Sequence, residues 1–389
     1  MKNRLSFCIL TLAFCIFTGC GAGSIVENIQ DAATKITDET ALNLAPQDNL
    51  FAIAASFTDP VGSIATVGLN NPHTAKNARA ITDSSDAVIR SFGGKIYVVN
   101  RGTTSSIQVI DPESFSILGN YSVGVGSNPQ DIIVTGGKAY ITRLDSEKDK
   151  TNTDDLWIVD PLNGAKIKTI DLKPYTTDDG DRLARANLMA LVGDKLYILL
   201  QDLSTNFSAT TNGKLVVLST QTDTVLQSIP LAGRDPTDIQ YNSSMGKLFI
   251  ADSGFFDSNF NNDTGTSYGG IETVDTTTNT SSGIVIDDAN FGGYVSMIRQ
   301  VSDTLALATV DASTIATFNP QTLTIGNKKL YTSPGAFLSD LLIDRNGLLW
   351  IPERDPKNAG LVLLDPQTGN TIAGPFAVGA LPASLTLIK

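Results

Sequence analysis

Short stretches in which apolar and polar residues alternate recur along most of the chain, and Gly, Pro, Asn or Asp residues separate them. One unit consists of Asp131–Val134, Ala139–Thr142, Leu156–Asp160 and Lys166–Leu172. A Thr-Gly-Gly-Lys turn joins the first two stretches, and a Pro-Leu-Asn-Gly turn joins the last two. Alternation bounded by such residues predicts β-strands connected by tight turns. We therefore expect four strands in this unit.

The unit is repeated, because a phrase similar to Val-Ile-Asp-Pro marks the same place in it at several points along the chain. Clear copies are Val109–Pro112, Ile158–Pro161, Thr317–Pro320 and Leu363–Pro366. The units begin near Ala87, Asp131, Leu188, Ile239, Met297 and Leu341. Repeats of roughly 45–55 residues with four strands each are typical of β-propeller blades.

One more blade is divided between the two ends of the chain. Its predicted strands are Leu50–Ser56, Ser63–Leu69, Asn77–Thr82 and, from the C-terminus, Leu385–Ile388. Such closure leaves no open sheet edge between the first and the last blade. We predict an all-β, seven-bladed β-propeller of four-stranded antiparallel blades, whose first blade is closed by the C-terminal strand. Six or eight blades are the alternatives.

The first full repeat resembles a known family. Tyr97–Asn100, Val109–Asp111 and Val123-Gly124 followed by Asn128-Pro129 look like the YVTN-type β-propeller repeat of surface-layer and exported bacterial proteins. The resemblance covers nearly all of residues 50–389, more loosely after the first repeat, and Asp131 stands where the pattern often has Gly. It implies a propeller but no single activity.

The N-terminus has the pattern of an export signal. Lys2 and Arg4 precede the apolar run Leu5–Phe17, which is too short for a permanent membrane span. Phe17-Thr18-Gly19-Cys20 resembles the lipobox of bacterial lipoproteins, with Phe17 where the family usually has Leu. The resemblance implies a signal peptide at 1–19, lipidation of Cys20, a tether at 20–49 and the propeller at 50–389. A soluble secreted protein is the alternative.

The lipoprotein hypothesis also sets the expected location. Gly21 follows the cysteine, where an aspartate would resemble an inner-membrane retention signal, so the outer membrane of the bacterial envelope is favoured. All three cysteines (Cys8, Cys15 and Cys20) lie in the signal region. The mature fold therefore has no disulfide, although it enters an oxidising compartment.

The net charge of the chain restricts the classes of molecule that it is expected to bind. The chain has 40 Asp and Glu against 28 Lys and Arg, a net charge of −12. Nucleic-acid binders need a concentrated positive field, so we expect no nucleic-acid partner. Only one histidine is present, His73, which leaves no multi-histidine metal site.

Unusually long connections are predicted on one face of the propeller, where second-to-third-strand loops and inter-blade segments meet. They are Leu144–Asp154, Lys173–Asn187, Asp202–Gly213, Asp252–Gly270, Asp287–Tyr294 and Glu353–Gly360. Long loops on a rigid scaffold usually carry binding, so we expect this face to dock a ligand. The alternative is neutral drift in loop length.

The starts of the innermost strands bring polar residues to the mouth of the central channel. The candidates are Asp86, Asp131, Asn187, Asp238 and Asp340. Carboxylates gathered there would repel each other, raise each other's pKa, or bind a cation. In the alternative, each side chain caps its own turn through backbone N–H groups.

The longest loop contains the sharpest local motif. Asp257, Asn259, Asn261 and Asp263 repeat oxygen ligands at every second residue, as in the first half of an EF-hand calcium loop. Asn262 replaces the turn glycine and Tyr268 the bidentate Glu, so a polar loop without calcium is the alternative. Loop aromatics either anchor a partner or pack back over the blade: Phe255, Phe256, Phe260 and Tyr268.

Together these patterns favour a non-enzymatic, lipid-anchored binding module for an envelope protein or polysaccharide, with calcium as the one cofactor considered. The first alternative is a calcium-dependent hydrolase that resembles propeller lactonases and gluconolactonases. Its cation would lie between Asp131, Asn187, Asp238 and Asp340. Those enzymes generally add a Glu ligand, which these positions lack. A structural surface-layer component is the second alternative.

Overall fold

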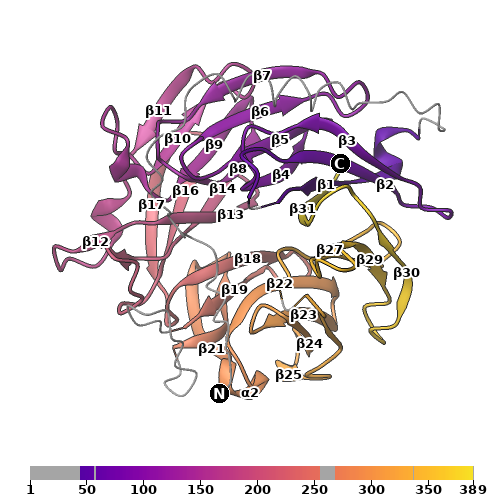
Figure 1. The fold of residues 1–389 in the computed structure, drawn as a ribbon. Helices are drawn as coiled ribbons and strands as arrows, with labels where there is room; N and C mark the ends of the chain where they lie inside the picture. Colours follow the sequence, from indigo (N-terminus) through magenta and orange to yellow (C-terminus); the bar gives the residue numbers. More distant parts are fainter. Residues whose placement is uncertain (1–43, 57, 255–267, 336, 389) are drawn as a thin grey trace, which may run out of the picture. The chain divides into compact units, whose positions relative to one another are not determined.

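A computed structural model of the protein describes residues 44–56, 58–254, 268–335 and 337–388. The chain divides after Asn43, and the compact unit that begins at Leu44 contains all of the described strands. In this unit seven four-stranded antiparallel sheets are arranged around a common axis (Figure 1). The predicted seven-bladed β-propeller is thereby confirmed.

Each blade contributes one strand to each of four positions counted outward from the axis. The innermost strands are β31 (Pro382–Leu387), β4 (Ala87–Phe92), β8 (Pro129–Thr135), β13 (Ala186–Val192), β18 (Pro236–Asn242), β22 (Val295–Ser302) and β27 (Leu342–Ile343). The second strands are β1 (Asn49–Ala54), β5 (Lys95–Asn100), β9 (Lys138–Arg143), β14 (Lys195–Leu200), β19 (Lys247–Ser253), β23 (Leu305–Val310) and β28 (Leu349–Glu353).

The outer half of each blade continues the same order. The third strands are β2 (Ser63–Gly68), β6 (Ser106–Ile110), β10 (Leu156–Val159), β16 (Lys214–Ser219), β20 (Gly269–Asp275), β24 (Thr314–Asn319) and β29 (Gly360–Leu364). The outermost strands are β3 (Ala75–Ile81), β7 (Ile117–Ser122), β11 (Lys166–Ile170), β17 (Thr224–Pro230), β21 (Thr280–Asp287), β25 (Thr324–Ile325) and β30 (Thr371–Phe376).

A few short elements lie outside this scheme. They are β12 (Arg182–Leu183), β15 (Leu203–Ser204), β26 (Tyr331–Thr332), the 3-10 helices η1 (Pro46–Asp48), η2 (Ser146–Lys148) and η3 (Lys173–Tyr175), and the helix α2 (Asp288–Phe291). Within the described residues, no helix has the length and apolar character needed to cross a membrane.

The hydrophobic core lies between neighbouring blades rather than in one central mass. Residues 196–200 of the second strand β14 are all fully buried, because another blade covers each face of their sheet. This explains why second strands are largely continuous apolar runs, whereas an outermost strand such as β7 is mostly exposed, including Ile117 and Leu118.

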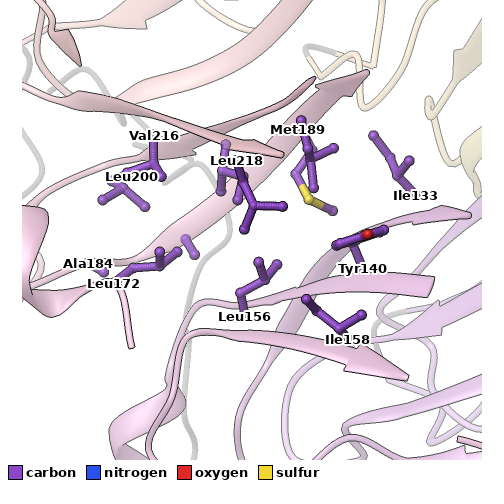
Figure 2. Close-up of a cluster of buried hydrophobic side chains, with 13 residues drawn as sticks. Ile133, Tyr140, Leu156, Ile158, Leu172, Ala184, Met189, Leu200, Val216 and Leu218 are labelled. Atoms are coloured by element: carbon purple, nitrogen blue, oxygen red, sulfur yellow. The ribbon is translucent and has the colours of Figure 1, made fainter. Parts of the chain in front are cut away.

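Figure 2 shows one such interface, between the blades that begin with β8 and β13. Ile133, Tyr140 and Ile158 come from the first blade, and Met189 and Leu218 come from the second. All of these side chains are at least nine-tenths buried. Seven wedge-shaped interfaces of this kind around an axis give each blade two partners, so no blade is expected to be stable alone.

The last strand of the chain completes the first blade. β31 pairs antiparallel with β1, with Leu50 opposite Leu387 and Ala52 opposite Leu385. Leu385 and Leu50 are buried against the neighbouring blade. The predicted closure of the first blade by the C-terminal strand is therefore confirmed.

Four innermost strands begin two or three residues earlier than their alternation predicts, at Pro129, Ala186, Pro236 and Val295. Each of these strands contains a register shift within its first residues. A β-bulge inserts an extra residue and interrupts the two-residue alternation, so the sequence pattern becomes visible only after it.

The repeated Val-Ile-Asp-Pro phrase also has a local explanation. The carboxylates of Asp111, Asp160 and Asp365 each accept hydrogen bonds from the backbone N–H groups two and three residues further on. This Asx turn starts the hairpin between the third and fourth strands. Backbone hydrogen bonds lower the pKa of Asp111 and Asp365, as expected for exposed turn carboxylates.

Candidate functional site

Two kinds of long connection meet on one face, which we call the long-loop face. It is formed by the loops between second and third strands and by the segments that join successive blades. Direct pairing of β12 with β15 shows this, because β12 lies in an inter-blade segment and β15 in a loop within a blade. Thr177 also donates its hydroxyl and its N–H to Asp202 across the same boundary.

Two buried arginines, Arg143 and Arg185, form ion pairs with acidic residues of the loop between β9 and β10. The Arg143 Nη2 atom lies 2.5 Å from Asp149 Oδ2, and Arg185 Nη1 pairs with Asp145 and, at 3.1 Å, with Glu147. Both arginines are almost completely buried. Buried charges persist only when they are paired, so breaking either pair would leave an uncompensated charge inside the protein.

Aromatic rings and further hydrogen bonds stiffen this loop. The Arg143 guanidinium lies 4.3 Å from the centroid of the Trp157 ring, and Arg185 lies 3.9 Å from that of Phe207. Burial alone would raise the pKa of Asp149, but hydrogen bonds from Thr151 and the charge of Arg143 lower it. Asp149 therefore remains ionised and paired with Arg143 at neutral pH.

Three of the predicted channel-mouth residues connect neighbouring innermost strands. Asp131 Oδ2 accepts from Met189 N at 3.1 Å, Asp238 Oδ2 from Ile298 N at 2.8 Å, and Asp340 Oδ2 from Leu385 N at 2.9 Å. In each case the acceptor lies in, or just before, one innermost strand and the donor lies in that of the next blade.

Two arginines that the periodic pattern does not single out form ion pairs with these three aspartates. We call Asp131, Asp238 and Asp340, together with Arg90 and Arg299, the ring. Arg299 donates to both Asp238, at 2.6 Å, and Asp340, at 3.0 Å. Arg90 donates to Asp131 at 2.8 Å. Burial alone would lower the pKa of Arg299, but the charges of Asp238 and Asp340 raise it. Comparing the innermost strands would have revealed both arginines, since each follows an Ile at the same strand position.

The two remaining channel-mouth residues lie outside the ring. Asp86 is partly exposed and pairs with Arg101, whose Nη1 reaches Gln130 Oε1 at 3.4 Å. Asn187 is the second residue of β13 and is partly buried.

This arrangement gives the ring carboxylates a structural role. Asp238 and Asp340 each accept a hydrogen bond on both carboxylate oxygens, and so does Asp131. Within the described ranges, no group of three or more His, Cys, Asp or Glu side chains is positioned to hold a metal ion. The alternative, in which each side chain caps its own turn, therefore holds only in part. Asp238 and Asp340 each accept from the backbone N–H of the following residue, but they also accept from the next blade.

Several predicted site residues lie outside the described residues, namely Cys20, Phe255, Phe256, Asp257, Asn259, Phe260, Asn261 and Asp263. Their predicted roles in lipidation, calcium binding and partner anchoring stay predictions. Tyr268 is described, and its ring lies 3.5 Å from the Arg234 guanidinium while its carbonyl accepts from Arg234 N. Tyr268 therefore packs back onto the segment before β18.

Comparisons with known proteins establish the fold but neither a family nor an activity. No protein-family model and no curated protein matches the chain. A functionally unknown protein from Desulfotomaculum acetoxidans matches with a TM-score of 0.57 and 12% identity, over 87% of this chain and 98% of that one. Identity this low supports a shared architecture only.

Two enzymes of known structure are similar at the same level. The dihydro-heme d1 dehydrogenase NirN matches with a TM-score of 0.53 and 13% identity, over 91% of this chain and 78% of that one. Hydrazine synthase from Kuenenia stuttgartiensis matches with a TM-score of 0.54 and 13% identity, over 77% and 87%. In fold, therefore, this chain is similar to propeller proteins of differing activities.

Proposed function

We propose that this protein is a lipid-anchored binding module of the bacterial cell envelope that docks a protein or polysaccharide through its long-loop face. One observation carries the proposal, namely that the long loops are braced by buried ion pairs such as Arg143–Asp149 and Arg185–Asp145. A loop that drifts neutrally in length has no need of such bracing.

Bracing favours binding because it reduces the entropy that a loop loses when it contacts a partner. The β12–β15 ladder and the bond between Asn128 Nδ2 and Asp145 Oδ2, at 3.1 Å, act in the same direction. The loops around the blades of β8 and β13 therefore form a surface that is organised before the partner arrives.

Exposed side chains on this surface supply the contacts. Val125 is 75% exposed at the tip of an inter-blade segment, between two glycines with positive φ angles. Lys148 is also exposed, and its Cβ atom lies 3.5 Å from the place that a Cβ atom on Gly126, next to Val125, would occupy. An apolar tip beside a charged side chain suits a protein or polysaccharide surface better than a small apolar molecule.

Anchoring through Cys20 and location at the outer membrane belong to the same proposal. They are supported by the resemblance of Phe17–Cys20 to a lipobox and by the YVTN-like repeat, which is typical of exported bacterial proteins. We assign the binding role to the long-loop face rather than to the channel mouth, because Asp131, Asp238 and Asp340 already accept hydrogen bonds from neighbouring blades.

A photo-crosslinking amino acid placed at Val125 tests the docking face in intact cells. We expect discrete crosslinked adducts from Val125, because the long-loop face contacts the partner. Matched positions on outermost strands, Ile117 and Ile372, are 55% and 50% exposed and serve as controls. Equal adducts from all three positions, or none from Val125, would contradict the proposal.

A further inference from the structure

Two carboxyl groups meet inside the blade that begins with β18. Asp252 lies near the end of β19, and Glu272 lies in β20, opposite Ile250. Because Ile250 and Asp252 are two residues apart on one strand, Glu272 and Asp252 leave the same face of the sheet. Both residues are 0% exposed.

This face of the sheet covers the segment that enters from the preceding blade, residues 231–235. Glu272 Oε2 accepts from Ala232 N at 2.8 Å and from Gly233 N at 3.0 Å, and its other oxygen accepts from Ser281. A Cβ atom on Gly233 would lie 2.3 Å from Asp252 Oδ2, so only glycine fits. Glu272 thus holds the inter-blade segment by hydrogen bonds, and Asp252 packs against Gly233 of the same segment.

Asp252 itself receives no hydrogen bond from the described residues on either carboxylate oxygen. An ionised carboxylate that is buried without donors or a cation is strongly disfavoured, whereas a neutral carboxyl group can donate a hydrogen bond instead. Burial raises the pKa of Asp252 well above its ordinary value, and the nearby charge of Glu272 raises it further. Asp252 therefore keeps its proton to a higher pH than an exposed aspartate does, and in that form it can donate to the neighbouring Glu272 side chain.

The surrounding elements add negative charge to this pair. Asp235 is partly buried, accepts from Gln201 Nε2 at 2.6 Å, and has its pKa raised to about 7 by desolvation. Of the cations on the neighbouring elements, Arg234 stacks on Tyr268, and Lys214 lies 3.5 Å from Asp202.

We propose that Asp252 and Glu272 form a proton-operated clasp that holds residues 231–235 of the long-loop face against the blade. The clasp is closed while the pair holds one proton. When the proton leaves to solvent, two adjacent buried carboxylates remain, and their repulsion releases Ala232 and Gly233. The clasp goes beyond the proposed function, since it needs no ligand.

The direction of the pH effect follows from linkage. A carboxyl whose pKa is raised by folding binds more protons in the folded state, so the closed form loses stability as the pH rises. Between the pKa of Asp252 in the open form and its higher pKa in the closed form, the closing equilibrium falls by up to tenfold per pH unit, roughly, and it levels off at higher pH.

Hydrogen–deuterium exchange of residues 231–235 in the full protein, corrected for intrinsic exchange rates between about pH 5 and about pH 9, tests the clasp. We expect the protection of Ala232 and Gly233 to fall at least tenfold over this range in the wild type. In Asp252→Asn, which keeps a hydrogen-bond donor for Glu272 but cannot ionise, protection should stay level. The same decline in both proteins would overturn the proposal.

Two further variants separate the clasp from other sources of pH dependence. Asp178→Asn makes the same chemical change at an exposed position and should behave as wild type. Asp235→Asn removes the neighbouring, partly buried carboxyl and should retain the decline. Loss of the decline in this variant, with Asp252 intact, would assign the effect to Asp235 instead. If Asp252→Asn folds poorly, Glu272→Gln provides the second test and should also level the profile.

Discussion

At the scale of single residues, aspartates with the same side chain do three different things. Asp160 closes its own turn, Asp238 links two blades, and Asp252 lies beside a second carboxyl without a donor among the described residues. Burial and the neighbouring strand decide among these roles, since the side chain itself is unchanged. The chemistry of each aspartate therefore depends on contacts that are distant in sequence.

Replacing Asp340 tests the ring at the channel mouth. Asp340→Ala leaves Leu385 N and one side of Arg299 without their acceptor, so we expect a loss of about 1–3 kcal/mol in the free energy of unfolding. Denaturant unfolding measures this loss, and Asp340→Asn, which keeps one acceptor oxygen, should fall between it and the wild type.

Asp365→Ala is the matched control for Asp340, because Asp365 accepts its hydrogen bonds in an exposed turn of the same blade. Its cost should stay below that of Asp340→Ala, since water can replace the lost acceptor. Equal losses in the two variants would mean that the ring adds no stability beyond an ordinary turn.

At the scale of elements, β31 does more than its length suggests. It supplies the innermost strand of the first blade, and its Ser384 hydroxyl accepts from Ile89 N at 3.2 Å in the next blade. On its other side it donates from Leu385 N to Asp340. One short strand therefore joins three blades.

A chain that ends at Leu381 lacks β31 and exposes the edge of β1. We expect most of this protein to aggregate, because an open apolar edge pairs with other chains. Soluble yield and light scattering measure the effect, and a chain that ends at Leu387, with β31 intact, is the control. Full solubility of the shorter chain would show that closure is dispensable, whereas recovery with an added peptide of residues 380–388 would support it.

At the scale of the whole molecule, the proposed anchor decides where the propeller acts. Cys20→Ala removes the only thiol that the lipobox resemblance assigns to lipidation. We expect the variant to move from the membrane fraction to the soluble fraction, because a lipid chain supplies most of the membrane affinity of such an anchor. Fractionation followed by immunoblotting measures this shift, and Cys15→Ala should stay with the membrane. Unchanged membrane association of Cys20→Ala would refute the anchor.

The blade count, the strand order and the closure could be read from the sequence because they depend on local periodicity. A strand with another blade on each face must be apolar throughout, and a turn that begins with Asp must have backbone donors two and three residues later. Both conditions restrict which residues can stand close together in the sequence, as in Tyr97–Asn100 and Ile158–Pro161.

Only the tertiary structure decided what the polar residues do. Asp238 meets Ile298 and Arg299, about 60 residues away, and Glu272 meets Ala232 and Gly233 across a blade boundary. Such contacts are set by blade packing and by bulges at the strand starts, which follow no fixed spacing. The sequence by itself therefore determined the scaffold, whereas packing between blades determined which side chains brace it and which remain available to a partner.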